Sequence, residues 1–378
     1  MDMNTFRSGV YQDRGDYKSF LPTLVNHSWE WTDAELNILL EQASSELGSL
    51  NAFSDLIPNI DIYIRMHIKT EANKSNKIEG TKTSIEEDLL PVEDIAPEKR
   101  DDQQEVHNYI RALNYGIKRI ADDDFPLCNR LICEIHKILL SGVRGKYKTP
   151  GEIRKSQNWI GGSKPSDAVY VPPNIVDLPD LMSDLEKFIN ADNWNVPNLI
   201  KIAILHYQFE TIHPFLDGNG RIGRLIIPLY LLDKNMLSKP CFYISDFFEK
   251  HRTEYYDALN RVRINNDLIG WIKVFLKAII ETAQSAKSKF KRVTLYVKET
   301  EEKALKLGGR SENTLKVLRL FYDEPVLDSS TIINKTGISK RTLDSIIKRF
   351  YENNILGELT GYSRNRVFVL AEYLKIFI

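Results

Sequence analysis

Residues 213 to 224 read His-Pro-Phe-Leu-Asp-Gly-Asn-Gly-Arg-Ile-Gly-Arg, and their side chains could bind and activate a phosphorylated ligand. Arg221 and Arg224 are three residues apart, so they share one face if this segment is helical. Their guanidinium groups match phosphate oxygens in shape and charge. Asp217 precedes them, and a lone carboxylate beside phosphates is a common way to hold Mg²⁺. His213 can accept a proton near neutral pH.

The backbone between these side chains also suits an anion. Gly218, Asn219 and Gly220 permit tight curvature and close approach of a ligand. A helix that begins here would present free N–H groups and a partial positive charge to a phosphate. The string is not a Walker A loop, because no Gly-Lys-Ser or Gly-Lys-Thr follows the glycines. From the pattern alone, a glycine-rich turn between two helices, with surface arginines, is an equally good interpretation.

Two apolar segments must position this loop. Residues 196–212 and 222–233 both carry apolar side chains at helical spacing. Pro214 should end the first helix, because proline lacks an N–H and restricts the residue before it. Pro228 predicts a kink or an early break in the second. We expect both helices to be buried, with the second one beginning at the loop.

The full string resembles the signature of the Fic family, HPF-x-[DE]-GNGR-x-x-R, at every fixed position. Fic proteins typically transfer AMP from ATP to a hydroxyl side chain of a target protein. The resemblance therefore implies ATP as substrate and Mg²⁺ as cofactor. It also implies that His213 is the general base and that Asp217 is the Mg²⁺ ligand. Gly218, Asn219 and Gly220 would form the nest for the inner phosphates, and Arg221 and Arg224 would hold the outer ones.

A second informative stretch, Ser75-Asn-Lys-Ile-Glu79-Gly80, ends a helix predicted over residues 59–79. Glu79 lies in the last turn, where the helix dipole disfavours a negative charge, so it is either solvated or paired with a cation. The stretch is similar to the Fic inhibitory motif, [ST]-x-x-x-E-[GN]. The resemblance implies that Ser75 and Glu79 restrain the enzyme, with Glu79 paired to Arg224 where the γ-phosphate of ATP would lie. Ser84 should cap a short helix that follows.

Residues 151–173 contain two short β-prone runs around Gly, Ser and Pro, which predict a hairpin. A two-stranded hairpin is marginal alone, so it must pack on the body or pair with another segment. In the Fic family this element is a flap that pairs with an extended target segment and presents its Ser, Thr or Tyr hydroxyl. That comparison assigns target docking to Trp159, Ile160 and Gly161, while a hairpin that only packs remains the alternative.

Further along, the pattern Tyr-Tyr-x-Ala-Leu at residues 255–259 resembles the Fic helix that follows the signature, where a tyrosine lines the adenosine site. This implies Tyr256 for that role, with Tyr255 as the second choice. A core position for the aromatic ring is as good an interpretation. His107 and His136 have no partner at metal-ligand spacing, so we expect both to be structural or exposed to solvent.

Residues 310–378 predict helix, helix, helix and hairpin, an order that resembles a winged helix. The third helix carries Lys340, Arg341, Lys348 and Arg349, and the hairpin carries Arg364 and Arg366, which is the layout of a DNA major-groove reader. However, 10 Lys and Arg face 8 Asp and Glu from residue 311 onward, so the segment is not strongly basic. Winged helices also contact proteins, so DNA binding and protein binding both stay open.

The whole chain has 378 residues and a net charge of −1, which gives no general attraction to nucleic acid or anionic membrane. Its three cysteines lack the spacing of a zinc site or a disulfide framework. We expect a cytoplasmic protein with no membrane segment and no signal peptide. A homodimer is left open.

These observations predict a mainly α protein: an N-terminal arm and inhibitory segment (1–100), a helical Fic core with a small β-hairpin flap (101–298), and a C-terminal winged-helix domain (299–378). Residues 1–30 are expected to be an irregular arm, and Thr32 is expected to begin a capping box for a helix that continues to about Leu47. The expected activity is transfer of AMP to a target protein and to the protein itself, restrained by Glu79. Two alternatives remain. One is a hydrolase that removes AMP with the help of Glu79, and the other is a nucleotide-sensing DNA-binding regulator.

Overall fold

The computed structural model describes residues 1–57, 60–191, 195–307, 311–360 and 366–378. Within them the chain is mainly helical, with two small antiparallel sheets. The helices and strands are β1 (Gly9–Asp13), β2 (Lys18–Pro22), α1 (Ala34–Leu56), α2 (Ile60–Ile78), α3 (Ile85–Asp88), α4 (Arg100–Ala121), α5 (Asn129–Leu139), α6 (Leu178–Asn190), α7 (Asn198–Ile212), α8 (Asn219–Asp233), α9 (Ser245–Lys250), α10 (Arg252–Asn265), α11 (Leu268–Lys306), α12 (Ser311–Asp323), β3 (Val326–Asp328), α13 (Ser329–Thr336), α14 (Lys340–Glu352), β4 (Gly357–Glu358), β5 (Val367–Val369) and α15 (Ala371–Leu374).

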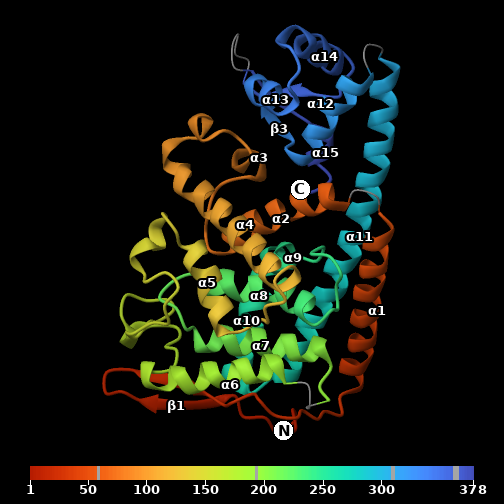
Figure 1. Cartoon of the computed structure of the whole chain (residues 1–378). Helices are drawn as coiled ribbons and strands as arrows, with labels where there is room; N and C mark the ends of the chain where they lie inside the picture. The colour runs from red at the N-terminus through yellow and green to blue at the C-terminus, as the bar shows by residue number, and fades with distance from the viewer. Residues whose placement is uncertain (58–59, 192–194, 308–310, 361–365) are drawn as a thin grey trace.

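Helices α7 and α8 form the centre of the body, as predicted (Figure 1). Every residue from Leu199 to Ile212 is buried, because α7 is covered by α6, α8 and α11. Of the kink or early break predicted at Pro228, the early break does not occur, since α8 continues to Asp233. Packing against α4, α5 and α7 holds α8 together where proline removes one backbone hydrogen bond.

The N-terminal segment is more regular than predicted. Residues 1–30 were expected to be an irregular arm, but β1 and β2 form an antiparallel hairpin with Gly9 opposite Pro22. Gly15, at a φ of 85°, allows the tight turn between them. The predicted helix starting after Thr32 is capped by Asp33 instead and continues to Leu56, because α1 lies along α11 (Figure 1).

The predicted flap hairpin is reduced to a single antiparallel bridge between Ile160 and Tyr170 within the described residues. Its remaining length is irregular, with Gly161 and Gly162 both at positive φ. The bridge is extended on one side by the N-terminal hairpin, because the Phe20 N–H donates to the Val171 carbonyl at 2.9 Å. The flap segment is therefore supported by β2 as well as by the helical body.

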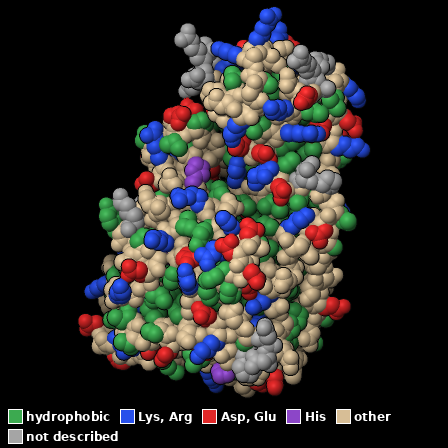
Figure 2. Space-filling view, viewed as in Figure 1, with side chains coloured by type: hydrophobic (Ala, Val, Ile, Leu, Met, Phe, Trp, Pro, Cys, Tyr) green, Lys and Arg blue, Asp and Glu red, His purple; other side chains and the backbone are tan. Residues whose placement is uncertain are grey.

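The C-terminal unit contains the predicted order of three helices and two strands, with an additional strand that completes a sheet of order β3–β5–β4. Ser339 caps α14 as its side chain accepts from the Thr342 N–H. Lys340, Arg341 and Lys348 are exposed on α14, whereas the turn that carries Arg364 lies outside the described residues. Both basic and acidic side chains are present on this unit in the face shown in Figure 2.

Helix α2 lies between the C-terminal unit and the rest of the molecule (Figure 1). On the C-terminal side, the Lys69 ammonium donates to the Asp323 carbonyl at 3.4 Å, and the rings of Tyr63 and Phe377 are 5.9 Å apart. The domain boundary predicted after residue 298 falls inside α11, which runs unbroken to Lys306. In the described part of the chain, no helix combines the length and the apolar character needed to span a bilayer.

Candidate functional site

The loop between α7 and α8 is held by its own asparagine. The Asn219 side chain accepts from the Phe215 N–H at 2.9 Å and donates to the Phe215 carbonyl at 2.9 Å. This two-point contact closes the loop into a tight turn, with Gly218 at a φ of 80° just before α8. The Asn219 amide side chain is thus used by the loop itself, while the first N–H groups of α8 face outward from the helix end, as helix geometry requires.

His213 ends α7 in the left-handed conformation, at φ 50° and ψ 60°. This conformation costs about 1–3 kcal/mol for a residue other than glycine, and such strain is concentrated at functional sites. The His213 Nδ1 atom lies 3.3 Å from the Glu210 carbonyl, so Nδ1 carries the proton and Nε2 is left as the proton acceptor. Burial lowers the pKa of His213 to about 4, so the imidazole is a neutral base at neutral pH.

Two side chains that the sequence did not single out hold His213 in this conformation. Arg154 donates through Nε to the His213 carbonyl at 3.0 Å, and Asn158 donates to the same carbonyl at 3.1 Å. The Arg154 guanidinium also donates to the carbonyls of Pro173 at 2.6 Å and Ser156 at 3.3 Å. Arg154 therefore ties both ends of the flap segment to the backbone of His213.

We expect Arg154→Ala to lower both stability and activity, because three carbonyl groups lose a charged donor in a buried place. An unsatisfied buried acceptor costs about 1–3 kcal/mol. Thermal unfolding and any nucleotide-dependent activity should both be measured. Lys155→Ala is the matched control: Lys155 forms an ion pair with Glu152 at 2.8 Å on the surface, and its loss should leave stability nearly unchanged. Equal stability of both variants would contradict the role of Arg154.

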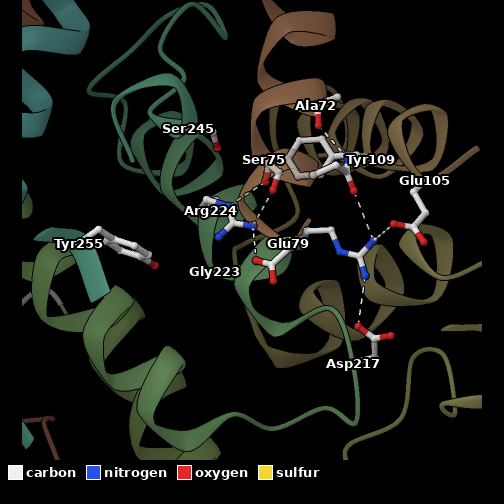
Figure 3. A network of polar contacts seen from close by, with 12 residues as sticks. Ala72, Ser75, Glu79, Glu105, Tyr109, Asp217, Gly223, Arg224, Ser245 and Tyr255 are labelled. Carbon is white, nitrogen blue, oxygen red and sulfur yellow. Dashed lines mark hydrogen bonds and ion pairs between the residues drawn. The ribbon is translucent and has the colours of Figure 1, made fainter. Parts of the chain in front are cut away.

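Arg224 is completely buried and binds the end of α2 (Figure 3). Its Nη2 donates to the Glu79 carboxylate at 2.6 Å and to the Ser75 carbonyl at 3.0 Å, and its Nε donates to the Ser75 hydroxyl at 2.8 Å. Its Nη1 makes no hydrogen bond to the described residues. The geometry places Ser75, Glu79 and Arg224 together, as the family resemblance implied.

Glu79 lies directly on the first turn of α8. A Cβ atom added to Gly220 would be 2.4 Å from the Glu79 Oε1 atom, so only glycine permits this approach. Burial alone would raise the pKa of the Glu79 carboxyl, but the charge and hydrogen bond of Arg224 outweigh it and hold the pKa below its usual value. An ionised carboxylate therefore occupies the place where a helix N-terminus and an arginine would receive an anion.

Arg221 lies on the other side of this end of α8. Its guanidinium donates to Glu105 at 3.1 Å, Asn76 at 3.4 Å and Asp217 at 3.2 Å. Two carboxylates thus orient the side chain and leave its Nε without a hydrogen bond to the described residues. Sequence reasoning missed Asn76 and Glu105, which lie on α2 and α4 far from the signature.

Asp217 is the residue that the sequence predicts as the Mg²⁺ ligand, and its carboxylate also accepts from Arg221 at 3.2 Å. Its side chain is 40 % exposed, at the rim of the loop. Among the described residues there is no group of three His, Cys, Asp or Glu that could enclose a metal. Mg²⁺ commonly binds through one carboxylate, waters and substrate phosphates, so a single carboxylate beside an anion site is an adequate donor set.

His136, on α5, holds the backbone of the loop at Asp217 by a hydrogen bond. Its Nδ1 accepts from the Gly151 N–H at 2.8 Å, so its Nε2 carries the proton and donates to the Asp217 carbonyl at 3.0 Å. Its ring stacks on Phe215 with centroids 3.8 Å apart. The structural role expected for His136 is therefore specific: it links α5 to the loop.

A cavity of about 440 Å³ opens beside His213, Arg224 and Glu79. Ile160 of the flap and both candidate tyrosines line it. Tyr255 is 1 % exposed and makes a 2.8 Å hydrogen bond to His206, as a core residue does. Tyr256 is 38 % exposed, so its ring can contact a ligand. Trp159 and Gly161 are near Ile160 in sequence but are not part of the cavity wall.

The fold and this loop define a class of helical proteins that present a glycine-rich anion site at the N-terminus of a buried helix, with a neutral histidine at its edge. Residues 126–231 match the Fic/DOC family, and residues 38–118 match the Fic/DOC family N-terminal region. The chain belongs to the Fic/DOC family.

Among its relatives, proteins named protein adenylyltransferase Fic from Culex quinquefasciatus and Aedes aegypti are each 32 % identical over 185 residues, which is 47 % of this chain and 33 % of theirs. The chain thus spans about a third of the length of these relatives. A Fic family protein from Desulfovibrio desulfuricans has a similar structure, with a TM-score of 0.55 and 20 % identity over 90 % of this chain and 96 % of that one. Fic-1 from C. elegans has a TM-score of 0.54 and 19 % identity over 70 % and 74 % of the two chains. At these identities the likeness concerns the fold.

Proposed function

We propose that this protein transfers AMP from ATP to a Ser, Thr or Tyr hydroxyl of a target protein, and to itself, and that Glu79 restrains the transfer. The observation that carries the proposal is the convergence of the neutral His213 and the buried Arg224 on one cavity, with the N-terminus of α8 between them. Relatives named protein adenylyltransferase support the same reaction class.

In this reaction the His213 Nε2 atom accepts the proton of the target hydroxyl, whose oxygen forms a bond to the α-phosphorus. The bond between the α-phosphorus and the bridging oxygen breaks, and pyrophosphate leaves. The N–H groups in the first turn of α8 stabilise the charge on the transferring phosphate, and Arg221 and Arg224 neutralise the outer phosphates. Asp217 would hold Mg²⁺ bound to the nucleotide, and the ion would supply further neutralisation of phosphate charge.

The target would approach along the flap. Residues 159–161 include Ile160, whose backbone forms the bridge to Tyr170, and this short pairing leaves backbone groups that an extended target segment could bind by strand addition. Trp159 and Ile160 are 39 % and 38 % exposed, so their side chains can contact such a segment. Arg154 would hold this docking edge at a fixed position relative to His213.

The test uses ATP labelled in two positions. The Glu79→Gly variant is incubated with Mg²⁺ and either α-labelled or γ-labelled ATP, and label on protein is counted after denaturation. AMP transfer predicts label from the α position alone, and mass spectrometry should then find one added AMP on a hydroxyl side chain. Label from the γ position, or no label from either in a folded variant that binds ATP, would contradict the proposal.

Removal of AMP from a modified target is a second candidate function. Glu79 is 35 % exposed and lines the same cavity as His213, so its carboxylate could also orient a water. Release of AMP from a modified substrate by the wild type, lost in Glu79→Gly, would support it.

We do not adopt the DNA-binding alternative, because Lys348 and Arg366 lie within ion-pair distance of Glu352 and Glu358, so acids offset their charge.

A further inference from the structure

Glu210 is a second acid in the nucleotide cavity, and neither the reaction nor the restraint described above uses its side chain. It lies on α7, one turn before His213, and is 8 % exposed. Its Oε1 atom makes no hydrogen bond to any described residue. The side chain lines the 440 Å³ cavity with Glu79, His213 and Arg224. A buried carboxyl oxygen without a hydrogen bond is costly, so a cavity ligand that reaches the Glu210 Oε1 atom would gain a contact there.

The Glu210 carboxyl lies against the backbone of α8 at Gly223. A Cβ atom added to Gly223 would be 2.2 Å from the Glu210 Oε1 atom, so the carboxyl rests on the backbone of α8 one turn beyond Gly220. Glycines at 220 and 223 thus give two carboxylates, Glu79 and Glu210, access to the same face of α8. Arg224, whose Nη1 has no hydrogen bond to a described residue, lies on this helix too.

We propose that Glu210 contacts the bound nucleotide as a neutral carboxylic acid, and that the protein takes up a proton at Glu210 when ATP binds. The proposal rests on the proposed function only in taking a nucleoside triphosphate as the ligand. As the neutral acid, Glu210 can donate one hydrogen bond to the nucleotide and accept another. The step is an equilibrium, in which one proton passes from solvent to the carboxylate and no covalent bond of the ligand changes.

The charges that face Glu210 explain why its carboxyl should gain a proton when ATP binds. Burial raises the pKa of Glu210 to about 7, Arg224 and Arg263 oppose this increase, and Glu79 adds to it. ATP entry would displace the single negative charge of Glu79 from Arg224 and introduce a triphosphate, which carries more negative charge even with Mg²⁺ bound. The pKa of Glu210 must then increase further, because a second anion in the same cavity disfavours the carboxylate.

The other titratable groups that face this cavity do not take up a proton so readily. The His206 Nδ1 donates to the Gly223 carbonyl at 3.1 Å and its Nε2 accepts from Tyr255, so both nitrogens are occupied in the neutral form. Burial lowers the pKa of His206 to about 3 and raises the pKa of Tyr256 to about 12, and Tyr255 is raised as well. Arg252 and Arg263, also in the wall, have only hydrogen-bond donors and no site for a further proton. His213 is the other group in this cavity that could take up the proton in place of Glu210.

The affinity for ATP should therefore decrease as the pH rises. A carboxyl whose pKa is higher in the complex than in the free protein makes binding tighter at low pH, and this advantage is lost as pH rises through the pKa of the complex. Proton uptake is greatest between the two pKa values, thus just above pH 7, and disappears below about pH 6, where Glu210 is already protonated in the free protein. In that window the affinity should fall by up to about tenfold per pH unit.

The experiment measures proton uptake by titration calorimetry with α,β-methylene-ATP, which cannot be cleaved at the α-phosphate, at constant Mg²⁺. Titrations at pH 7.5 (about half a unit above the pKa of Glu210) in buffers of different ionisation enthalpy give the number of protons bound. We expect uptake by the wild type, reduced uptake by Glu210→Gln and unchanged uptake by His213→Ala. Glu79→Gly should take up more than the wild type, because the free Glu210 is then less repelled.

Equal proton uptake by the wild type and a folded Glu210→Gln variant would overturn the proposal, as would loss of the uptake in His213→Ala. If Glu210→Gln does not fold, infrared difference spectroscopy of the wild type decides: binding at pH 8 must increase the C=O band of a protonated carboxyl, and no increase would refute the idea. Binding with AMP transfer but no uptake contradicts this inference alone, whereas absence of ATP binding to Glu79→Gly contradicts the proposed function.

Discussion

Glu79→Gly should increase AMP transfer by orders of magnitude while changing ATP affinity much less. In the wild type, Glu79 accepts from Arg224 at 2.6 Å, so Nη2 is not free for the γ-phosphate. Its carboxylate also lies on the first turn of α8, against Gly220. A triphosphate bound beside it would be displaced from the in-line position, and a misplaced reacting group can cost about a hundredfold in rate even when the substrate binds. Labelled AMP on protein, measured against ATP concentration, checks both quantities.

Two control variants test whether the increase in transfer depends on Glu79 and Arg224. Glu98→Gly removes an exposed acid from the same N-terminal part of the chain and should leave transfer unchanged. Arg224→Ala added to Glu79→Gly should cancel the gain, because the released arginine is the group that holds the outer phosphates. Circular dichroism must verify folding, since Glu79→Gly leaves the buried Arg224 charge without its partner. Equal or lower transfer by a folded Glu79→Gly variant would refute the restraint.

His213→Ala, made in the Glu79→Gly background, should lower AMP transfer by about 10²–10⁴-fold, the usual contribution of a general base. The reason is the loss of the Nε2 acceptor, which the Nδ1 contact to the Glu210 carbonyl leaves free of a proton. ATP affinity should change little, because the phosphates are held by the first turn of α8 and by the two arginines. Single-turnover transfer and equilibrium ATP binding separate the two effects.

His27→Ala is the matched control for this variant, because His27 is exposed on the N-terminal segment, before α1. It should transfer AMP at the rate of the Glu79→Gly parent. A His213→Ala variant that keeps near-full transfer would show that another group removes the proton, and the assignment of the base would then be wrong.

The sequence predicted the centre of this fold well, because the signals there are local and redundant. Apolar residues at helical spacing mark α7 and α8, and Pro214 and Gly218 mark the loop between them. The predictions were less accurate where tertiary packing outweighs local preference. Helix α1 continues past Gly48 to Leu56 along α11, and α8 continues past Pro228 inside the core. The flap became one bridge instead of a hairpin, because β2 and Arg154 hold its backbone.

The sequence by itself determined the chemical groups of the site: a histidine, a carboxylate, a glycine-rich turn and two arginines within twelve positions, and a distant Ser-x-x-x-Glu motif. Only the tertiary structure decided which of these groups face one another. It brought Glu79 of the α2 end to Arg224 of α8, added Glu105 and Asn76 as partners of Arg221, and placed the Glu210 Oε1 atom in the cavity wall with no hydrogen bond to a described residue. The physical reason is that ion pairing and burial depend on distances through space between elements far apart in sequence, and spacing along the chain does not contain those distances.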